Sequence, residues 1–319
     1  MLVLDKPYVS AYLLRLAEDH DLAVLDTPSA RRFADGYRIR FVDGPEARAG
    51  APRILTSSEN ALADVADVFP DPRLAARIDR FKDKLAFRRA TASLHPDIAF
   101  RALTFDELPG VDASELRYPC VIKPAVGFFS MSVHPLFGPE AWAPAVVDIQ
   151  AEVAVARGLY PSSVVDASVF IVEQMLEGEE FAVDGSFDAA GRPVILSIFR
   201  HLFASDHDVS VRVYVTSKEI IEACLPAFSD YLAQLGRATE CREFPFHAEL
   251  RRDRSGTLRP IEVNPLRFGG WCTTADLTAQ AFGMDPYLAW LRSEVPDWSA
   301  TLEGQEGKTY AIVVLDDSA

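Results

Sequence analysis

Short apolar runs and amphipathic helical stretches alternate along the whole of this chain. Near the N-terminus, the apolar runs 2–5 and 23–26 flank a stretch from Ser10 to Glu18 with apolar residues at helical spacing. This order is typical of a βαβ unit with parallel strands. We therefore expect residues 1–78 to form a small α/β domain. It contains no GxGxxG motif, so the sequence gives no support for a dinucleotide site there.

The same alternation continues to the C-terminus. We expect further strands at 53–56, 118–122, 164–173, 181–187, 193–199 and 310–315. We expect further helices at 60–69, 72–94, 218–236, 275–281 and 286–292. Strands and helices that mix along a whole chain are typical of α/β and α+β folds.

The charge balance limits the classes of partner. The 32 basic and 47 acidic residues give a net charge of −15. Because binding to nucleic acid or an anionic membrane depends on basic residues, we expect neither partner. No apolar run approaches the ~20 residues of a membrane span, and residues 1–10 have no signal pattern. The four cysteines form no CxxC pair, so we expect a reduced, cytoplasmic protein.

Residues 244–264 predict a β-hairpin around a turn at 253–256. Side chains alternate between the two faces of a strand, so the pairing across the turn decides which residues share a face. We expect Arg252 to pair with Thr257. A loop one residue longer or shorter would move one strand's side chains to the other face.

With that pairing, Glu249 faces Pro260 and shares a face with Glu262 and Asn264. The opposite face is then apolar, with Ala248, Leu250, Ile261 and Val263. Two interpretations stay open. The charged face meets water as in an ordinary half-buried hairpin, or its two carboxylates and one amide oxygen hold Mg²⁺.

Three further segments carry possible binding groups. Only six residues are lysines; Lys123 follows an apolar strand and precedes a Gly/Ser loop, whereas Lys84 lies on a predicted helix. Such a loop and lysine suit phosphate, although Lys-Pro is also a common turn and a helical lysine often meets only water. The strand–turn–strand from Glu173 to Glu180 offers backbone groups for an adenine and a carboxylate for a ribose, or is an ordinary hairpin.

In their order along the chain, these segments resemble the ATP-grasp superfamily, including amino-acid ligases and D-alanine–D-alanine ligase. The shared features are Asp83-Lys84, a lysine at a strand end, two glutamates seven residues apart, and an acid followed by Glu-x-Asn. The resemblance covers residues 75–290. It implies an ATP-grasp fold, with an N-terminal βαβ domain at 1–78 and two α+β subdomains at 79–172 and 173–319 that clamp the nucleotide.

The resemblance also implies a role for each matching residue. ATP would be bound by Lys84, Lys123, Gly127, Ser130, Glu173, Gln174, Met175, Leu176 and Glu180, with the lysines on the phosphates and Glu180 on the ribose. The metal, Mg²⁺ with Mn²⁺ as an alternative, would be held by Glu249, Glu262 and Asn264. Lys123 would act in catalysis together with Arg267, which we expect to hold a substrate carboxylate; its alternative role is pairing with a neighbouring acid.

Two departures from the family pattern concern the phosphates. Phe129 and Ser132 stand where many members have glycine, which predicts a stiffer or more apolar loop. His247 stands where D-alanine ligases carry an arginine. The phosphate site then lacks one positive charge unless Arg200, Arg212 or Arg267 supplies it.

The resemblance implies a ligase that activates a carboxylate, from an amino acid or a small acid, with ATP. The acylphosphate then reacts with an amine and ADP is released. Two alternatives are a phosphotransferase on the same fold and a non-catalytic nucleotide-binding module. The expected partners are small molecules, and a homodimer is left open as the assembly state.

Overall fold

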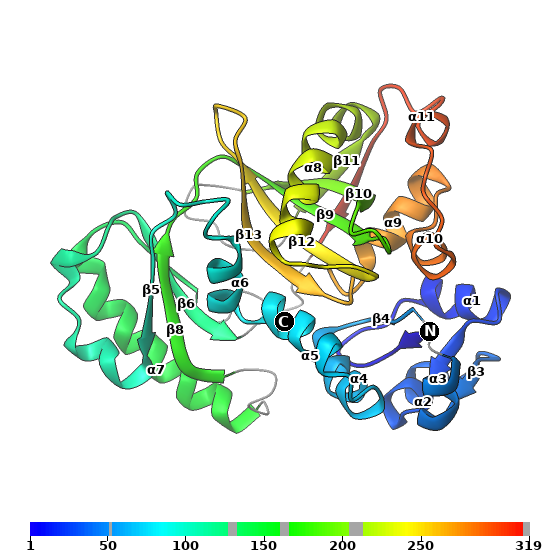
Figure 1. Cartoon of the computed structure of the whole chain (residues 1–319), viewed down its shortest axis with the longest axis horizontal. Helices are drawn as coiled ribbons and strands as arrows, with labels where there is room; N and C mark the ends of the chain where they lie inside the picture. The colour runs from blue at the N-terminus through cyan, green and yellow to red at the C-terminus, as the bar shows by residue number, and fades with distance from the viewer. Residues whose placement is uncertain (51–52, 127–132, 160–165, 204–212, 315–319) are drawn as a thin grey trace.

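The computed structural model of this protein describes residues 1–50, 53–126, 133–159, 166–203 and 213–314. Three separate sheets organise the chain, with α5 (Pro72–Lys82) and α6 (Lys84–Thr91) between them (Figure 1). The mixed α/β class predicted from the sequence is confirmed. Each sheet falls within one of the three predicted segments, apart from the last two residues of β8, and the division into domains remains a proposal.

The first sheet is parallel and confirms the predicted βαβ start. Its strands, in the order β3-β2-β1-β4, are β1 (Leu2–Val3), β2 (Ala23–Leu25), β3 (Arg40–Val42) and β4 (Leu55–Thr56). Helix α1 (Ala11–Asp19) begins at Ser10, whose hydroxyl accepts the Leu13 N–H. The sequence analysis missed β3 and the helices α2 (Pro28–Phe33) and α3 (Gly44–Gly50). It did predict helix α4 (Leu62–Val68).

The second sheet is antiparallel, in the order β5-β8-β6-β7, and packs against α7 (Trp142–Leu159). Its strands are β5 (Phe100–Thr104), β6 (Cys120–Val126), β7 (His134–Leu136) and β8 (Asp166–Gln174). The prediction that Lys123 ends its strand was wrong. Strand β6 continues to Val126, because Lys123 and Pro124 still pair with β8 after β7 has ended.

The third sheet is antiparallel, in the order β13-β12-β9-β10-β11-β14, with the long helix α8 (Lys218–Ala238) against one face. Its strands are β9 (Glu179–Phe187), β10 (Pro193–Leu202), β11 (Val213–Ser217), β12 (Phe244–Arg252), β13 (Leu258–Pro265) and β14 (Thr309–Val313). Helices α9 (Thr273–Phe282), α10 (Pro286–Arg292) and α11 (Trp298–Thr301) follow β13. Buried phenylalanines fill the space between the sheet and α8. Asp184, His247 and Glu249 lie on the opposite face.

The single helix expected at 72–94 is in fact two. Asp83 has an extended backbone, and its carboxylate accepts the N–H groups of Leu85 and Ala86, so it ends α5 and starts α6. The apolar spacing continues through the break and hides it from a periodicity argument. As a result, Lys84 stands in the first turn of its helix.

The predicted register of the β12–β13 hairpin was also wrong. Arg252 pairs with Leu258, so the loop is one residue longer than expected. A β-bulge between Glu249 and Leu250 shifts the register again, and Glu249 lies opposite Glu262. The two shifts add up to two residues, one full period of side-chain alternation, so the predicted grouping of the carboxylates on one face holds.

The bulge changes the surroundings of one apolar residue. Ile261, which the sequence places on the buried face with Val263, is partly exposed and lines the cavity described below.

In the part of the chain that the structure describes, no helix is both long and apolar enough to cross a membrane.

Candidate functional site

A cavity of about 520 Å³ brings the predicted site residues together from all along the chain. It is lined by Lys84, Lys123, Glu173, Gln174, Met175, Leu176, Glu180, Glu249, Glu262 and Arg267, among others. Asn264 neighbours Glu262 on β13 but does not line the cavity. Gly127 and Ser130 lie outside the described residues, as do Phe129 and Ser132.

Glu173 is the centre of a buried group of ion pairs. Its carboxylate lies 2.8 Å from the Lys123 ammonium and 2.5 Å from Arg88 Nε, and its side chain is 3% exposed. Burial raises the pKa of Glu173, but Arg88 and Lys123 outweigh burial and lower it to about 2. The sequence reading missed Arg88, which also donates to the carbonyls of Pro260 and Ile261 at the bulge. Glu173 therefore orients Lys123 toward the cavity and joins β8 to the hairpin through Arg88.

Glu249 and Glu262 face each other across the hairpin. Lys84 Nζ lies 3.1 Å from Glu262 Oε2, and Asn264 Nδ2 donates to Glu262 Oε1 at 3.2 Å. Burial and then the nearby Glu262 raise the pKa of Glu249. Burial also raises the pKa of Glu262, but Lys84 and Lys123 outweigh it and lower it below its usual range. Like charges directly opposite each other in a sheet repel, so this pair favours a bound cation.

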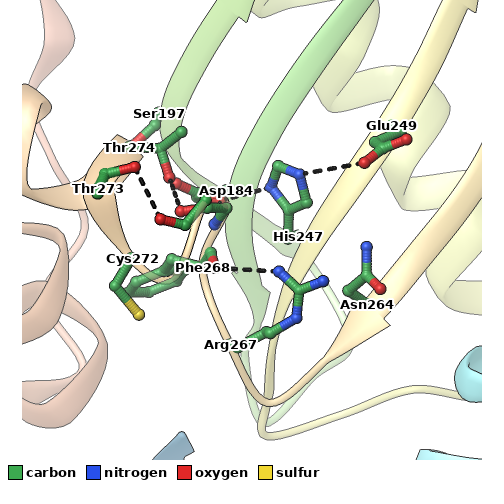
Figure 2. A network of polar contacts seen from close by, with 12 residues as sticks. Asp184, Ser197, His247, Glu249, Asn264, Arg267, Phe268, Cys272, Thr273 and Thr274 are labelled. Carbon is green, nitrogen blue, oxygen red and sulfur yellow. Dashed lines mark hydrogen bonds and ion pairs between the residues drawn. The ribbon is translucent and has the colours of Figure 1, made fainter. Parts of the chain in front are cut away.

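His247 lies between two carboxylates (Figure 2). Its Nδ1 is 2.8 Å from Asp184 Oδ1, and its Nε2 is 3.7 Å from Glu249 Oε1. Burial lowers the pKa of His247, but the hydrogen bond with Asp184 and the contact with Glu249 outweigh burial and raise it to about 9. His247, at the position where the resemblance to D-alanine ligases led us to expect an arginine, is thus positively charged at neutral pH. That charge faces Asp184 and Glu249.

Glu180, which the resemblance places on the ribose, contacts a histidine and an arginine side chain. Its two oxygens lie 2.7 Å from His201 Nδ1 and 2.8 Å from Arg251 Nη2. The His201 ring stacks on Tyr214, with centroids 4.3 Å apart. The sequence reading missed these three cavity residues. Strand alternation could have found Arg251, because it lies two residues after Glu249 on β12.

Residues 174–176, which the resemblance places against the adenine, offer fewer available backbone N–H donors than the sequence suggests. The N–H of Gln174 donates to the Ala99 carbonyl and that of Met175 to the Pro119 carbonyl. Among the described residues, the Leu176 N–H donates to no backbone carbonyl, so it is the donor that this segment offers to a ligand.

Arg267 lines the cavity and is paired with an acid. Its Nη2 lies 3.1 Å from Glu59 Oε1, and its Nη1 donates to the Phe268 carbonyl at 3.3 Å. Of the other arginines weighed for the phosphates, Arg200 pairs with Glu179 and does not line the cavity. Arg212 lies outside the described residues. Arg267 is therefore the one of the three that the described structure brings to the site.

The donor types in the cavity suit a phosphate-bearing ligand and a hard divalent cation. In the described residues, no group of three or more His, Cys, Asp or Glu side chains is arranged to hold a metal ion. Two opposed carboxylates with an adjacent amide nevertheless fit Mg²⁺, which usually takes one or two protein carboxylates and completes its shell with phosphate and water oxygens.

Comparisons with known proteins agree with this description. A family model described as an ATP-grasp domain matches residues 116–275, half of the chain. No protein matches in the search of curated proteins.

Solved structures share the fold at low identity. An L-amino acid ligase from Bacillus licheniformis superposes with a TM-score of 0.64 at 19% identity, over 89% of this chain and 72% of the ligase. A biotin carboxylase from Campylobacter jejuni gives 0.62 at 11%, over 94% and 72%. An N5-carboxyaminoimidazole synthase from Aspergillus clavatus, in complex with ADP, gives 0.59 at 15%, over 92% and 77%.

Proposed function

Because this chain belongs to the ATP-grasp domain family, we propose that it is an ATP- and Mg²⁺-dependent ligase that joins a carboxylate to an amine. The observation that carries the proposal is a single cavity that several charged groups line. They are two lysines, two opposed carboxylates and a buried arginine: Lys84, Lys123, Glu249, Glu262 and Arg267. Transfer of a phosphoryl group to a carboxylate requires cationic side chains for the phosphates and carboxylates for the metal, and this cavity has both. The L-amino acid ligase fold supports an amino acid or a small acid as the substrate.

A carboxylate is a poor electrophile until it is phosphorylated, so the first task is to stabilise the transferring phosphoryl group. We assign this task to Lys84 and Lys123, which line the cavity from α6 and β6. Glu173 holds Lys123 in place, and this fixed orientation removes the need to reorganise the charge during the reaction. The Leu176 N–H would bind the adenine and Glu180 the ribose, the latter in competition with His201 and Arg251.

The metal would be held by Glu249, Glu262 and Asn264, and when bound it supplies positive charge to the phosphates. Lys84, 3.1 Å from Glu262, partly neutralises that carboxylate. Arg267 would hold the carboxylate of the acid, in exchange for or alongside its contact with Glu59. The domain division at 1–78, 79–172 and 173–319 belongs to the same proposal, with the acid bound where the first and third segments meet at Glu59 and Arg267.

The deciding experiment is a screen for ADP release over amino acids and small dicarboxylates, tried singly and in pairs. A ligase releases ADP at full rate only when an acid and an amine are both present. ADP release with an acid alone at the same rate would instead assign a phosphotransferase.

Nucleotide binding has its own test. A saturating ligand that binds only the folded state stabilises it by about 2.7 kcal/mol at a concentration 100-fold above its Kd, so MgATP should raise the melting temperature. If millimolar MgATP produced no thermal shift and no calorimetric heat, that result would contradict the assignment of the cavity to a nucleotide.

A further inference from the structure

We propose that Asp184 and His247 are positioning residues that hold Glu249 in place and join it to the glycine loop, Phe268-Gly269-Gly270, which follows Arg267. The inference rests on the proposed function, because it takes Glu249 as a metal ligand. It assigns a role to a buried polar pair to which the proposed function gives none.

The pair lies on neighbouring strands, directly opposite in register. His247 on β12 pairs with Asp184 on β9 on one side and with Asn264 on β13 on the other. The 2.8 Å contact between Nδ1 and Asp184 Oδ1 fixes the ring, and the fixed ring presents Nε2 to Glu249 (Figure 2). Groups that orient metal ligands in this way control metal affinity in many sites.

The glycine loop meets the same pair through two contacts. The Gly269 N–H donates to Asp184 Oδ1 at 2.9 Å, the oxygen that also binds His247. A Cβ at position 269 would lie 2.5 Å from His247 Cε1, so only glycine allows the loop to lie against the ring. One carboxylate oxygen therefore links the loop that begins at Arg267 to the side chain that faces Glu249.

Stability alone does not account for this arrangement. Asp184 is 1% exposed, and its Oδ2 has no hydrogen-bond partner in the part of the chain that the structure describes. A buried carboxylate with an unsatisfied oxygen lowers stability, and an apolar pair of the same size would pack without that cost. The polar pair is thus better explained by what it orients.

The test measures metal affinity directly, by titrating the protein with Mn²⁺ in the presence of ADP and following free Mn²⁺ by electron paramagnetic resonance. In His247→Asn the amide occupies the place of Nδ1 and keeps the contact with Asp184 but does not reach Glu249. In His247→Gln the amide extends to the place of Nε2. We expect about tenfold weaker Mn²⁺ binding for the asparagine variant and recovery of most of the affinity with glutamine. Because both variants are neutral, a difference between them cannot come from the lost charge.

A third variant leaves every polar side chain in place. Gly269→Ala should also weaken Mn²⁺ binding, because its methyl group displaces the His247 ring. Gly110→Ala is the matched control, since a Cβ there has no neighbour within 4 Å, and His95→Gln is a control for a buried histidine that hydrogen-bonds Tyr231 and does not line the cavity. Both controls should bind Mn²⁺ like the wild type.

The outcomes distinguish failure of the positioning role from failure of the metal site. If the His247 variants and Gly269→Ala bind Mn²⁺ as tightly as the wild type, or if Asn and Gln weaken it equally, Asp184 and His247 do not position Glu249 and the proposed function still stands. If the wild type with ADP binds no Mn²⁺, both the inference and the metal site fall.

Discussion

Two groups of charged residues face the same cavity and are built in opposite ways. The Glu173 group consists of one carboxylate between two cations, Arg88 and Lys123. The hairpin group has two opposed carboxylates, Glu249 and Glu262, with Lys84 beside one of them. The Glu173 side chain is 3% exposed, whereas those of Glu249 and Glu262 are about one-fifth exposed, at 21% and 19%.

The difference assigns a structural and electrostatic role to each group. The Glu173 group has a surplus of positive charge and connects β8 with α6 and β13, so it suits anchoring and the attraction of phosphate. The hairpin group has a surplus of negative charge at the cavity wall, so it suits a cation. We therefore expect loss of Glu173 to affect mainly folding and loss of Glu262 to affect mainly activity.

The largest expected effect is on turnover in Glu262→Ala. The side chain faces the cavity, so its removal leaves no hole in the core and relieves repulsion with Glu249. Turnover should fall on the order of 10³-fold or more, as for loss of a principal electrostatic stabiliser, with little change in melting temperature. The exposed Glu303→Ala is the control. An unfolded Glu262 variant would make this residue structural and would remove the contrast between the two groups.

The second prediction concerns Glu173→Gln, which leaves Arg88 and Lys123 buried without their shared counterion. Removal of one member of a buried ion pair costs about 3–5 kcal/mol, so the free energy of unfolding in urea should fall by that order. Glu179→Gln is the matched control, since Glu179 pairs with Arg252 at a half-exposed position and should change stability by less than about 1 kcal/mol. Equal losses in the two variants would refute the anchoring role.

The same comparison has a pH dependence. In the folded protein the pKa of Glu173 is about 2, below its ordinary value of 4.5, so the ion pairs stabilise the fold fully above about pH 4.5. The contribution is lost as the pH falls toward 2. The stability difference between wild type and Glu173→Gln should therefore be constant at neutral pH and shrink on acidification. A difference that stays constant down to pH 2 would contradict the assigned ion pairs.

Arg267 provides a third case, because it is paired with Glu59 and also lines the cavity. If it holds the acid, Arg267→Lys should be nearly as damaging as Arg267→Ala, since lysine cannot present two parallel donors. We expect kcat/KM for the acid to fall about 10²-fold in both variants, with ATP affinity little changed. A loss of ATP affinity that lysine restores would move Arg267 from the acid to the phosphates.

The smallest expected effect separates two lysines. Lys123→Ala removes a cation at the cavity, whereas Lys218→Ala removes one that pairs with Glu222 and Glu306 at the start of α8. ATP affinity, measured by calorimetry, should fall on the order of tenfold for Lys123 and remain unchanged for Lys218. Similar affinities in the two variants would mean that the positive surplus of the Glu173 group does not serve the phosphates.

The local sequence pattern by itself determined much of the secondary structure and part of the candidate site. Strand alternation grouped Glu249, Glu262 and Asn264 on one side of the hairpin, and helical periodicity located α1, α8 and α10 within two residues at each end. The order of weak motifs indicated the ATP-grasp family, which the family model confirms. These features depend on residues close in sequence, whose spacing directly sets which face they occupy.

Tertiary structure alone decided the partners of the charged groups. Nothing near Glu173 in the sequence points to Arg88, 85 residues away, and nothing near Arg267 points to Glu59, 208 residues away. The β-bulge that sets Glu249 opposite Glu262 leaves no mark in the alternating pattern, because its shift and that of the longer turn add up to two residues, one full period. Such pairings follow from how the sheets pack, and burial then makes each charge require a partner that only the folded chain can supply.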